Sequence, residues 1–295
     1  MDAWEIEISS DSDPELCISS GALTHGKPSG KRRFVVLNLF SGPAGRRDGL
    51  AAYFKAVNID TVKCDSINVH LSDQGILDDA IRGRIKQDIR AGRYDFVFGG
   101  PPCRSFSESR SAGPGPPVLR DQEYPYGFPK SQWRKEFRPH HYEQIRQGNL
   151  LAERTAEACA IMHEMDRPYA VEQPTPFKGA VTMFQFDSFS ALVHRGARLV
   201  HFDQCMHGAL SKKPTTILHG HCDFSSLAAF CNHPKETQTN EDGSTYMAPH
   251  PSYVGRKRAN GKYLTSDLAA YSGKLNCRLA TLINATLVNS PSDTS

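Results

Sequence analysis

The sequence predicts an α/β fold with a mostly parallel, doubly wound sheet. Short runs of β-branched and aromatic residues, FVVLNLF (34–40), YDFVFGG (94–100) and RPYAVEQP (167–174), predict buried strands. Between them lie segments with helical spacing, such as 76–92, which ends at a glycine. Alternating strands and helices require crossover connections, which make neighbouring strands parallel. Polar motifs follow the strands directly, and the ligands of such sheets lie beyond the carboxyl ends of the strands.

The rest of the chain extends this pattern. Further strands are predicted at 61–66, 197–205 and 213–220, and further helices at 49–57, 143–165 and 264–288. We expect five regions: a disordered acidic tail (1–32), a catalytic core (33–220), a small irregular insert (221–262), a C-terminal helix that packs back on the core (263–290) and a disordered tail (291–295). The Gly- and Pro-rich segment 111–130 is long for a loop, which indicates a functional role.

Composition favours an intracellular protein with a polyanionic partner. Residues 1–16 hold six acidic and no basic residues, so the rest of the chain has 35 basic against 26 acidic residues. No apolar run approaches ~18 residues and no signal-peptide pattern opens the chain, so we expect no membrane association. The eight cysteines are irregularly spaced, which favours free thiols, a nucleophile or metal ligands over disulfides. We expect a monomer, in the nucleus if the source is eukaryotic.

A glycine-rich turn follows the first predicted strand. In LNLFSGPAGRRDGL (37–50), Gly42 and Gly45 let the backbone pass close to a ligand, and the next helix offers free N–H groups. The turn lacks the spacing of dinucleotide sites and the Lys-Ser/Thr of P-loops. Asp65, near the end of the second strand, is a candidate acceptor for ribose hydroxyls. A strand–helix turn without a ligand, and a surface Asp65, are the alternatives.

Two further motifs place reactive groups at strand ends. In FGGPPCRSFS (98–107), two prolines stiffen the chain before Cys103, and Arg104 beside it would favour the nucleophilic thiolate. In AVEQPTPF (170–177), Glu172 precedes Pro174 and Pro176, so its carboxyl group is held at the same edge for acid–base or hydrogen-bonding work. The alternatives are a buried structural cysteine and a capping or salt-bridged glutamate.

The order of these motifs resembles that of the DNA cytosine-C5 methyltransferases. FSGPAG (40–45), PPCRSFS (101–107) and VEQP (171–174) are similar to that family's cofactor turn, nucleophile loop and glutamate segment, and FDQCMHGALSKKPT (202–215) is similar to its later basic segment. The pattern is nearest to the compact branch of phages and mobile elements. The resemblance covers about residues 34–220, and a weaker similarity extends to AAYSGKLNCRLA (269–280). The resemblance implies a Rossmann-like class I S-adenosylmethionine-dependent methyltransferase fold with a small recognition insert.

By this resemblance, the cofactor S-adenosyl-L-methionine would contact Phe40, Ser41, Gly42, Gly45 and Pro101, with Asp65 on its ribose. Cys103 would add to C6 of a flipped-out cytosine, and Glu172 would hydrogen-bond the base. Candidates for nucleic-acid contacts are Arg104, Ser105, Ser107, Arg110 and Arg120.

The sequence departs from the family pattern at two places. Gln173 stands where the family has Asn, and Lys213 replaces the first arginine of the late basic motif while the second is missing. The substrate is therefore DNA in our leading hypothesis and RNA in the alternative. A catalytically silent nucleic-acid-binding or regulatory protein of the same fold is the rival.

The insert contains a candidate zinc site. Cys222, Cys231, His233 and His250 offer the ligand types of a tetrahedral structural site, although no CxxC pair is present. Free thiols and surface histidines are the alternative. The basic run GRKRANGK (255–262) fits either a phosphate-contacting hairpin or a solvated loop.

Overall fold

The computed structural model describes residues 33–40, 49–56, 62–67, 75–106, 110, 116–133, 135–176, 180–239, 243–251, 253 and 270–289. Both predicted tails, Ser41, Gly42, Gly45, Ser107 and the basic run 255–262 lie outside these residues. Within them, no helix is both long enough and apolar enough to cross a membrane.

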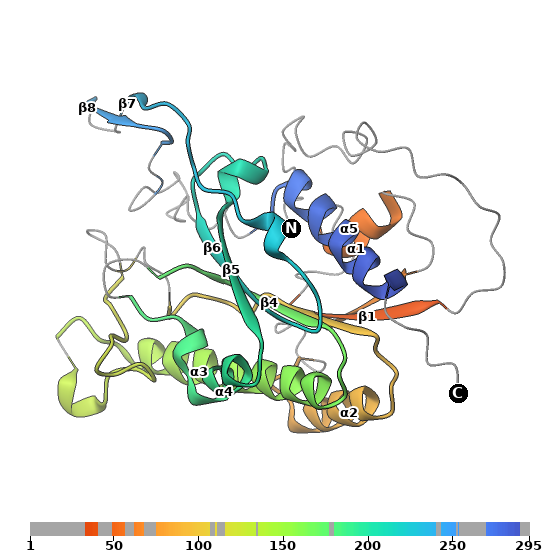
Figure 1. Ribbon diagram of the computed structural model, residues 1–295. Helices are drawn as coiled ribbons and strands as arrows, with labels where there is room; N and C mark the ends of the chain where they lie inside the picture. The colour runs from red at the N-terminus through yellow and green to blue at the C-terminus, as the bar shows by residue number, and fades with distance from the viewer. Residues whose placement is uncertain are drawn as a thin grey trace, which may run out of the picture.

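A six-stranded sheet forms the centre of the molecule (Figure 1). Its strand order is β2-β1-β3-β4-β6-β5. The strands are β1 (Phe34–Leu39), β2 (Val62–Ile67), β3 (Phe96–Gly99), β4 (Tyr169–Pro174), β5 (Arg198–Asp203) and β6 (Pro214–Gly220). The pairs β1–β2, β1–β3 and β3–β4 are parallel, which confirms the prediction of a largely parallel α/β sheet.

Strand β6 is antiparallel to both of its neighbours, which the sequence pattern did not predict. The chain between β5 and β6 contains only the short 3-10 helix η6 (Gln204–His207). A parallel crossover needs a dozen or more residues, commonly with a helix, so this short connection returns the chain alongside β5 in the opposite direction.

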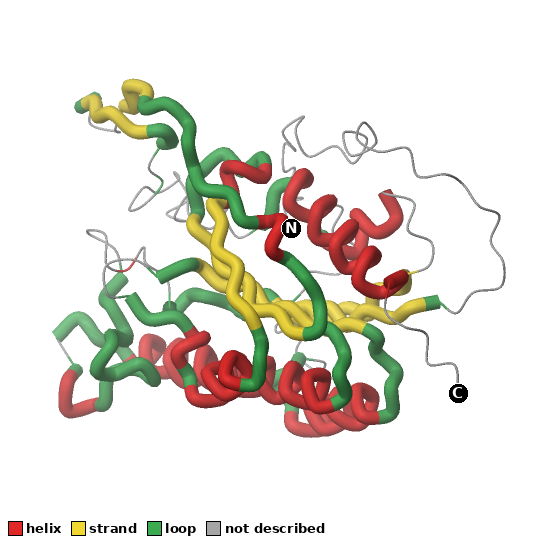
Figure 2. Tube along the Cα trace, viewed as in Figure 1, coloured by secondary structure: helices red, strands yellow, loops and turns green. Residues whose placement is uncertain are grey.

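Helices cover both faces of the sheet (Figures 1 and 2). One face carries α2 (Asp79–Arg90), α3 (Pro139–Glu164) and α4 (Asp187–His194), and the other carries α1 (Leu50–Ala56) and α5 (Gly273–Asn289). Successive strand residues alternate between the two layers: Leu37, Val97 and Val171 join the α2–α3–α4 side, whereas Val36, Phe96 and Ala170 join the α1–α5 side. This period of two, with both faces buried, explains why the strands are apolar throughout.

Several boundaries differ from the prediction. Helix α3 begins at Pro139 rather than at 143, because proline is well suited to the first helical position, where its missing N–H is not needed. Helix α4 was not predicted, and the described part of the C-terminal helix begins at Gly273. Short 3-10 helices lie at Lys130–Gln132 (η4), Met183–Gln185 (η5) and Ser225–Leu227 (η7).

The predicted insert 221–262 is not uniformly irregular. Phe224 and Leu227 are fully buried in the α1–α5 layer, so the start of this segment belongs to the core. Strands β7 (Glu236–Thr239) and β8 (Thr245–Ala248) then form a separate antiparallel hairpin that projects away from the sheet (Figure 1).

Candidate active site

The predicted motifs meet at one edge of the sheet. In the parallel register Leu39 lies beside Gly99, and Gly99 lies beside Val171. The next residue of each strand, namely Phe40, Gly100 and Glu172, therefore reaches the same carboxyl edge. Because β2 lies on one side of β1 and β3 on the other, the strand order reverses direction at β1, which is where open α/β sheets bind ligands.

The Pro-Pro-Cys loop is anchored from the neighbouring strand. Gln173, fully buried at the end of β4, donates from Nε2 to the carbonyl oxygen of Pro101 at 2.7 Å. The Phe106 N–H donates to the Cys103 carbonyl oxygen at 2.8 Å and closes a turn around the cysteine. Cys103 itself is a free, half-buried thiol. Gln173, at the position where the resemblance expects Asn, thus joins the nucleophile loop to the glutamate strand.

Glu172 is buried beside this loop. Its Oε2 lies 3.8 Å from the position that a Cβ on Gly100 would occupy, and the Tyr271 hydroxyl lies 2.9 Å from the same position. Tyr271 makes a side-chain hydrogen bond to Glu172. The other carboxyl oxygen, Oε1, has no hydrogen-bond partner within the described part of the chain. A buried carboxyl oxygen without a partner costs free energy unless a ligand supplies a donor.

The electrostatics of the site link Cys103, Glu172 and Lys213. Burial raises the pKa of Glu172, and Lys213 and the Tyr271 hydrogen bond partly offset this effect. Burial and the nearby Glu172 raise the pKa of the Cys103 thiol, whereas Lys213 and Arg104 lower it. A protonated Glu172 would no longer repel the thiolate, so protonation of the carboxyl group favours ionisation of the cysteine.

Lys213 reaches the site from the start of β6. Its backbone has a positive φ of 33°, which is unusual for a lysine, and its carbonyl oxygen accepts hydrogen bonds from Gln204 N at 3.3 Å and Thr215 Oγ1 at 3.0 Å. Its Nζ lies 5.6 Å from the centroid of the Tyr271 ring. The surrounding contacts thus hold a strained residue whose ammonium group faces the site.

Arg120 and Ser105, which were predicted to contact nucleic acid, instead point into the protein. Arg120 is buried and donates to Ser105 Oγ at 2.9 Å and to Asn149 Oδ1 at 3.0 Å, with its guanidinium 3.9 Å from the ring centroid of Phe106. Ser105 is buried by the same contacts. Burial, followed by the charge of the nearby Arg110, lowers the pKa of Arg120 to about 9. Arg120 and Ser105 brace the nucleophile loop and present no polar group to a phosphate.

Arg110 is also engaged by the protein. Its guanidinium donates to the carbonyl oxygens of Arg104 and Pro117 and to Gln144 Oε1. Burial, followed by the nearby Arg104, lowers its pKa to about 10. Arg104 is exposed next to Cys103 and is the remaining described candidate for a phosphate contact. Two arginines that the sequence analysis assigned to the substrate therefore hold the segment 116–133 in place: Arg110 binds its Pro117, and its own Arg120 binds Ser105 and Asn149.

The cofactor side of the site is described in part. Phe40 has a positive φ of 67°, so the chain turns sharply as soon as it leaves β1. Asp65 lies two residues before the end of β2, where its carboxylate pairs with Lys63 at 2.8 Å and Arg93 at 3.7 Å. A carboxylate engaged in this way is poorly placed for a ribose, so the geometry argues against that role for Asp65.

A second group of reactive side chains lies beyond the end of β5. Cys205, Cys231, His233 and His250 place one ligand atom each within 4.8 Å of all the others. The prediction of Cys222 as a member is wrong: its thiol donates to the carbonyl oxygens of Tyr169 and Gly220 and packs against the core. Cys205 takes its place, because η6 turns the chain back toward the start of the β7–β8 segment.

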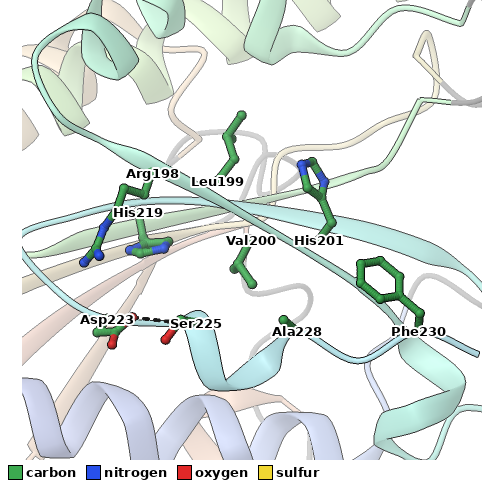
Figure 3. Close-up of a pocket in the computed structure, with 9 residues that line it drawn as sticks. All are labelled: Arg198, Leu199, Val200, His201, His219, Asp223, Ser225, Ala228 and Phe230. Atoms are coloured by element: carbon green, nitrogen blue, oxygen red, sulfur yellow. Dashed lines mark hydrogen bonds between the residues drawn. The ribbon is translucent and has the colours of Figure 1, made fainter.

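A cavity lies elsewhere, beside strand β5. A pocket of about 320 Å³ is formed by strand β5 and the segment 219–230 (Figure 3). Its lining includes Val200, His219 and Phe230, but not Cys103 or Glu172. Figure 3 shows Asp223 and Ser225 across from Val200, joined by a hydrogen bond from the Ser225 N–H to Asp223 at 2.9 Å. The cavity is separate from the group of motif residues.

Three residues of these sites had no assigned role in the sequence analysis. Tyr271 lies in a segment noted only for its general similarity, and nothing in the local pattern places its hydroxyl on Glu172. Gln173 was visible as a departure from the family motif. Cys205 is the last residue of the predicted strand 197–205, and that position at a strand end is the one local signal that would have included it among the metal ligands.

Comparisons with known proteins leave the family open. No protein-family model matches the chain, and no curated protein matches it. Among solved structures, the chain is similar to the Entamoeba histolytica methyltransferase EhMeth, with 11% identity and a TM-score of 0.35. The match covers 70% of this chain and 59% of that one, so the chain spans less than two thirds of that structure. A similarity of this size does not assign the chain to a family.

Proposed function

We propose that this protein transfers a methyl group from S-adenosylmethionine to C5 of cytosine in DNA, with Cys103 as the nucleophile. The observation that carries the proposal is the buried Glu172 carboxyl group. Its Oε1 has no hydrogen-bond partner among the described residues, and its charge raises the pKa of the nearby Cys103 thiol. A cytosine between the two groups would offer N3 and the exocyclic amine to the carboxyl group and C6 to the sulfur.

The carboxyl group suits this role in its protonated form. Because burial raises the pKa of Glu172, the protonated acid is favoured and can donate to N3 while its other oxygen accepts from the amine. The hydrogen bond donated to N3 draws electron density from the ring and makes C6 more electrophilic, whereas the one accepted from the amine orients the base. The Tyr271 hydroxyl hydrogen-bonds to the carboxyl group, and the charge of Lys213 acts on it from nearby.

The proposed reaction consists of addition to C6 of cytosine, methyl transfer to C5 and elimination. The Cys103 thiolate adds to C6, the S–C6 bond forms, and the electron pair moves to C5. The bound cofactor supplies an electrophilic methyl group on a sulfonium. C5 would take this methyl group as the methyl–sulfonium bond breaks and the neutral thioether S-adenosylhomocysteine leaves. Transfer of the C5 proton to water, with cleavage of the S–C6 bond, would then restore the thiolate. The base must lie outside the duplex stack, because the sulfur approaches perpendicular to its plane.

Two features of the described site fit a ligand at the edge of the sheet where the strand order reverses direction. Gly100 has no side chain, so the Tyr271 hydroxyl and the Glu172 carboxyl group can approach the start of the nucleophile loop, and Phe40 has a positive φ directly after β1. Phe40, Pro101 and, outside the described residues, Ser41, Gly42 and Gly45 are the residues that we propose to hold the cofactor.

A trapping experiment tests the proposal. The full chain is incubated with S-adenosylmethionine and duplex DNA containing 5-fluorocytosine, which blocks loss of the group at C5. We expect a denaturant-resistant protein–DNA complex, absent with Cys103→Ala and formed about 10²–10⁴-fold more slowly with Glu172→Gln. The rate should pass through a maximum as pH rises, because the Cys103 thiol must ionise while Glu172 must stay protonated, and the pKa values of both groups are raised.

Matched RNA is the second arm. A complex with RNA alone would move the substrate class to RNA and refute the DNA assignment. A complex that persists in Cys103→Ala would refute the assigned nucleophile. Failure to trap either nucleic acid, by a folded chain that binds S-adenosylmethionine, would overturn the enzymatic proposal in favour of a silent nucleic-acid-binding protein.

A further inference from the structure

The four side chains beyond the end of β5 come from three separate segments. Cys205 lies on η6, Cys231 and His233 lie just before β7, and His250 lies just after β8. All four ligand atoms are within 4.8 Å of one another. Cys231 Sγ lies 3.4 Å from His233 Nδ1 and 3.3 Å from His250 Nε2.

These separations fit a tetrahedral ion. With Zn–S bonds of about 2.3 Å and Zn–N bonds of about 2.0 Å, a tetrahedral centre places its ligand atoms roughly 3.3–3.8 Å apart. The set contains two thiols and two imidazoles and no carboxylate, and such soft ligands favour zinc over magnesium or calcium. We infer that Cys205, Cys231, His233 and His250 bind one structural zinc ion.

The surroundings support the ligands in the manner of a metal site. The Cys231 N–H donates to Asp203 Oδ2 at 2.8 Å, so the carboxylate at the end of β5 holds the cysteine backbone. The His250 ring also hydrogen-bonds to the backbone of Leu210. Metal-binding histidines are commonly oriented by such a second contact. Because four protein ligands complete the coordination shell, the ion has no open position for catalysis.

The β7–β8 hairpin gives the zinc ion a structural purpose. Both strands are largely exposed, and Met247 is 60% exposed, so the hairpin has almost no apolar layer of its own. An isolated two-stranded hairpin is only marginally stable in water. The ion would join both ends of the hairpin to η6, and therefore to the turn that leads to Lys213. This inference does not depend on the proposed methyl transfer.

Metal content of the full-length chain tests the inference. We expect the purified wild-type protein to contain about one zinc ion per chain, and cobalt substitution to give the visible absorption bands of a tetrahedral site with thiolate ligands. His233→Ala is the most informative variant because His233 is exposed and its removal should leave the core folded. His233→Ala and Cys231→Ser should lower zinc affinity at least about tenfold.

Cys222→Ser is the matched control, because this thiol lies in the same sequence region but outside the cluster. It should retain wild-type zinc. Chelation should accelerate amide hydrogen exchange in 231–250 and leave β1 and β3 protected. Zinc-free wild-type protein that also fails to bind cobalt would overturn the inference, as would full zinc retention in both His233→Ala and Cys231→Ser. A Cys205–Cys231 disulfide in place of the metal would also overturn it.

Discussion

Replacing Gln173 with Leu tests whether β4 holds the nucleophile loop in place. The substitution nearly preserves side-chain volume and removes the Nε2 donor that lies 2.7 Å from the Pro101 carbonyl oxygen. The site is 1% exposed, so water cannot replace the donor. A buried carbonyl left without its partner costs about 1–3 kcal/mol. The leucine also removes Gln173 Oε1, which has no hydrogen-bond partner in the described part of the chain, and this removal offsets part of that cost.

We therefore expect the free energy of unfolding to fall by about 1–2 kcal/mol, which lowers the melting temperature of a chain of this size by roughly 2–8 °C. The effect on chemistry should be larger. A displacement of about 1 Å in a reacting group can cost roughly 100-fold in rate, and Pro101 is two residues from Cys103. Urea denaturation measures the first quantity, and the rate of 5-fluorocytosine trapping measures the second.

Tyr169→Phe is the matched control for this experiment. It removes a side-chain hydrogen bond, Tyr169 Oη to His163 Nδ1 at 3.1 Å, from the opposite end of the same strand. We expect it to lower stability without slowing trapping. If Gln173→Leu traps DNA at the wild-type rate, or if both variants slow it equally, Gln173 does not position the loop.

The other predictions concern pH and packing. Burial raises the pKa of Glu172 in the folded protein, so the contribution of this residue to stability is greatest below about pH 4.5 and is lost as the folded carboxyl group ionises. Glu172→Gln should therefore become more stable relative to wild type as pH rises above about 4.5. A melting-temperature difference that does not change with pH would contradict this. Arg82 and Lys86 lower the pKa of Glu157 to about 2, so Glu157→Gln should cost about 1–3 kcal/mol at pH 7, and that difference should disappear as acid protonates the folded wild type near pH 2. Gly100→Ala should displace the Tyr271 hydroxyl, 2.9 Å from the added carbon, and cost about 1–3 kcal/mol; unchanged thermal stability together with an unchanged trapping rate would show that the contact is not tight.

Local pattern was sufficient for much of the fold. The apolar runs at β1, β3 and β4 are buried on both faces, so their composition alone distinguishes them from half-exposed strands. The alternation of strands and helices determined the parallel pairing and therefore the edge at which Cys103 and Glu172 lie. The proline-rich motifs also follow their strands directly, so connectivity was enough to place them.

Contacts between distant segments decided the rest. The sequence analysis assigned Arg120 to the substrate. Only the packing of 116–133 shows that the Arg120 guanidinium is already hydrogen-bonded to Ser105 and Asn149. Tyr271 and Cys205 are further examples, because each meets its site only through contacts between segments that are far apart in the sequence. A sequence determines which chemical groups are present and the period on which they repeat, whereas the direction in which a side chain points at a strand end depends on what the whole chain packs against it.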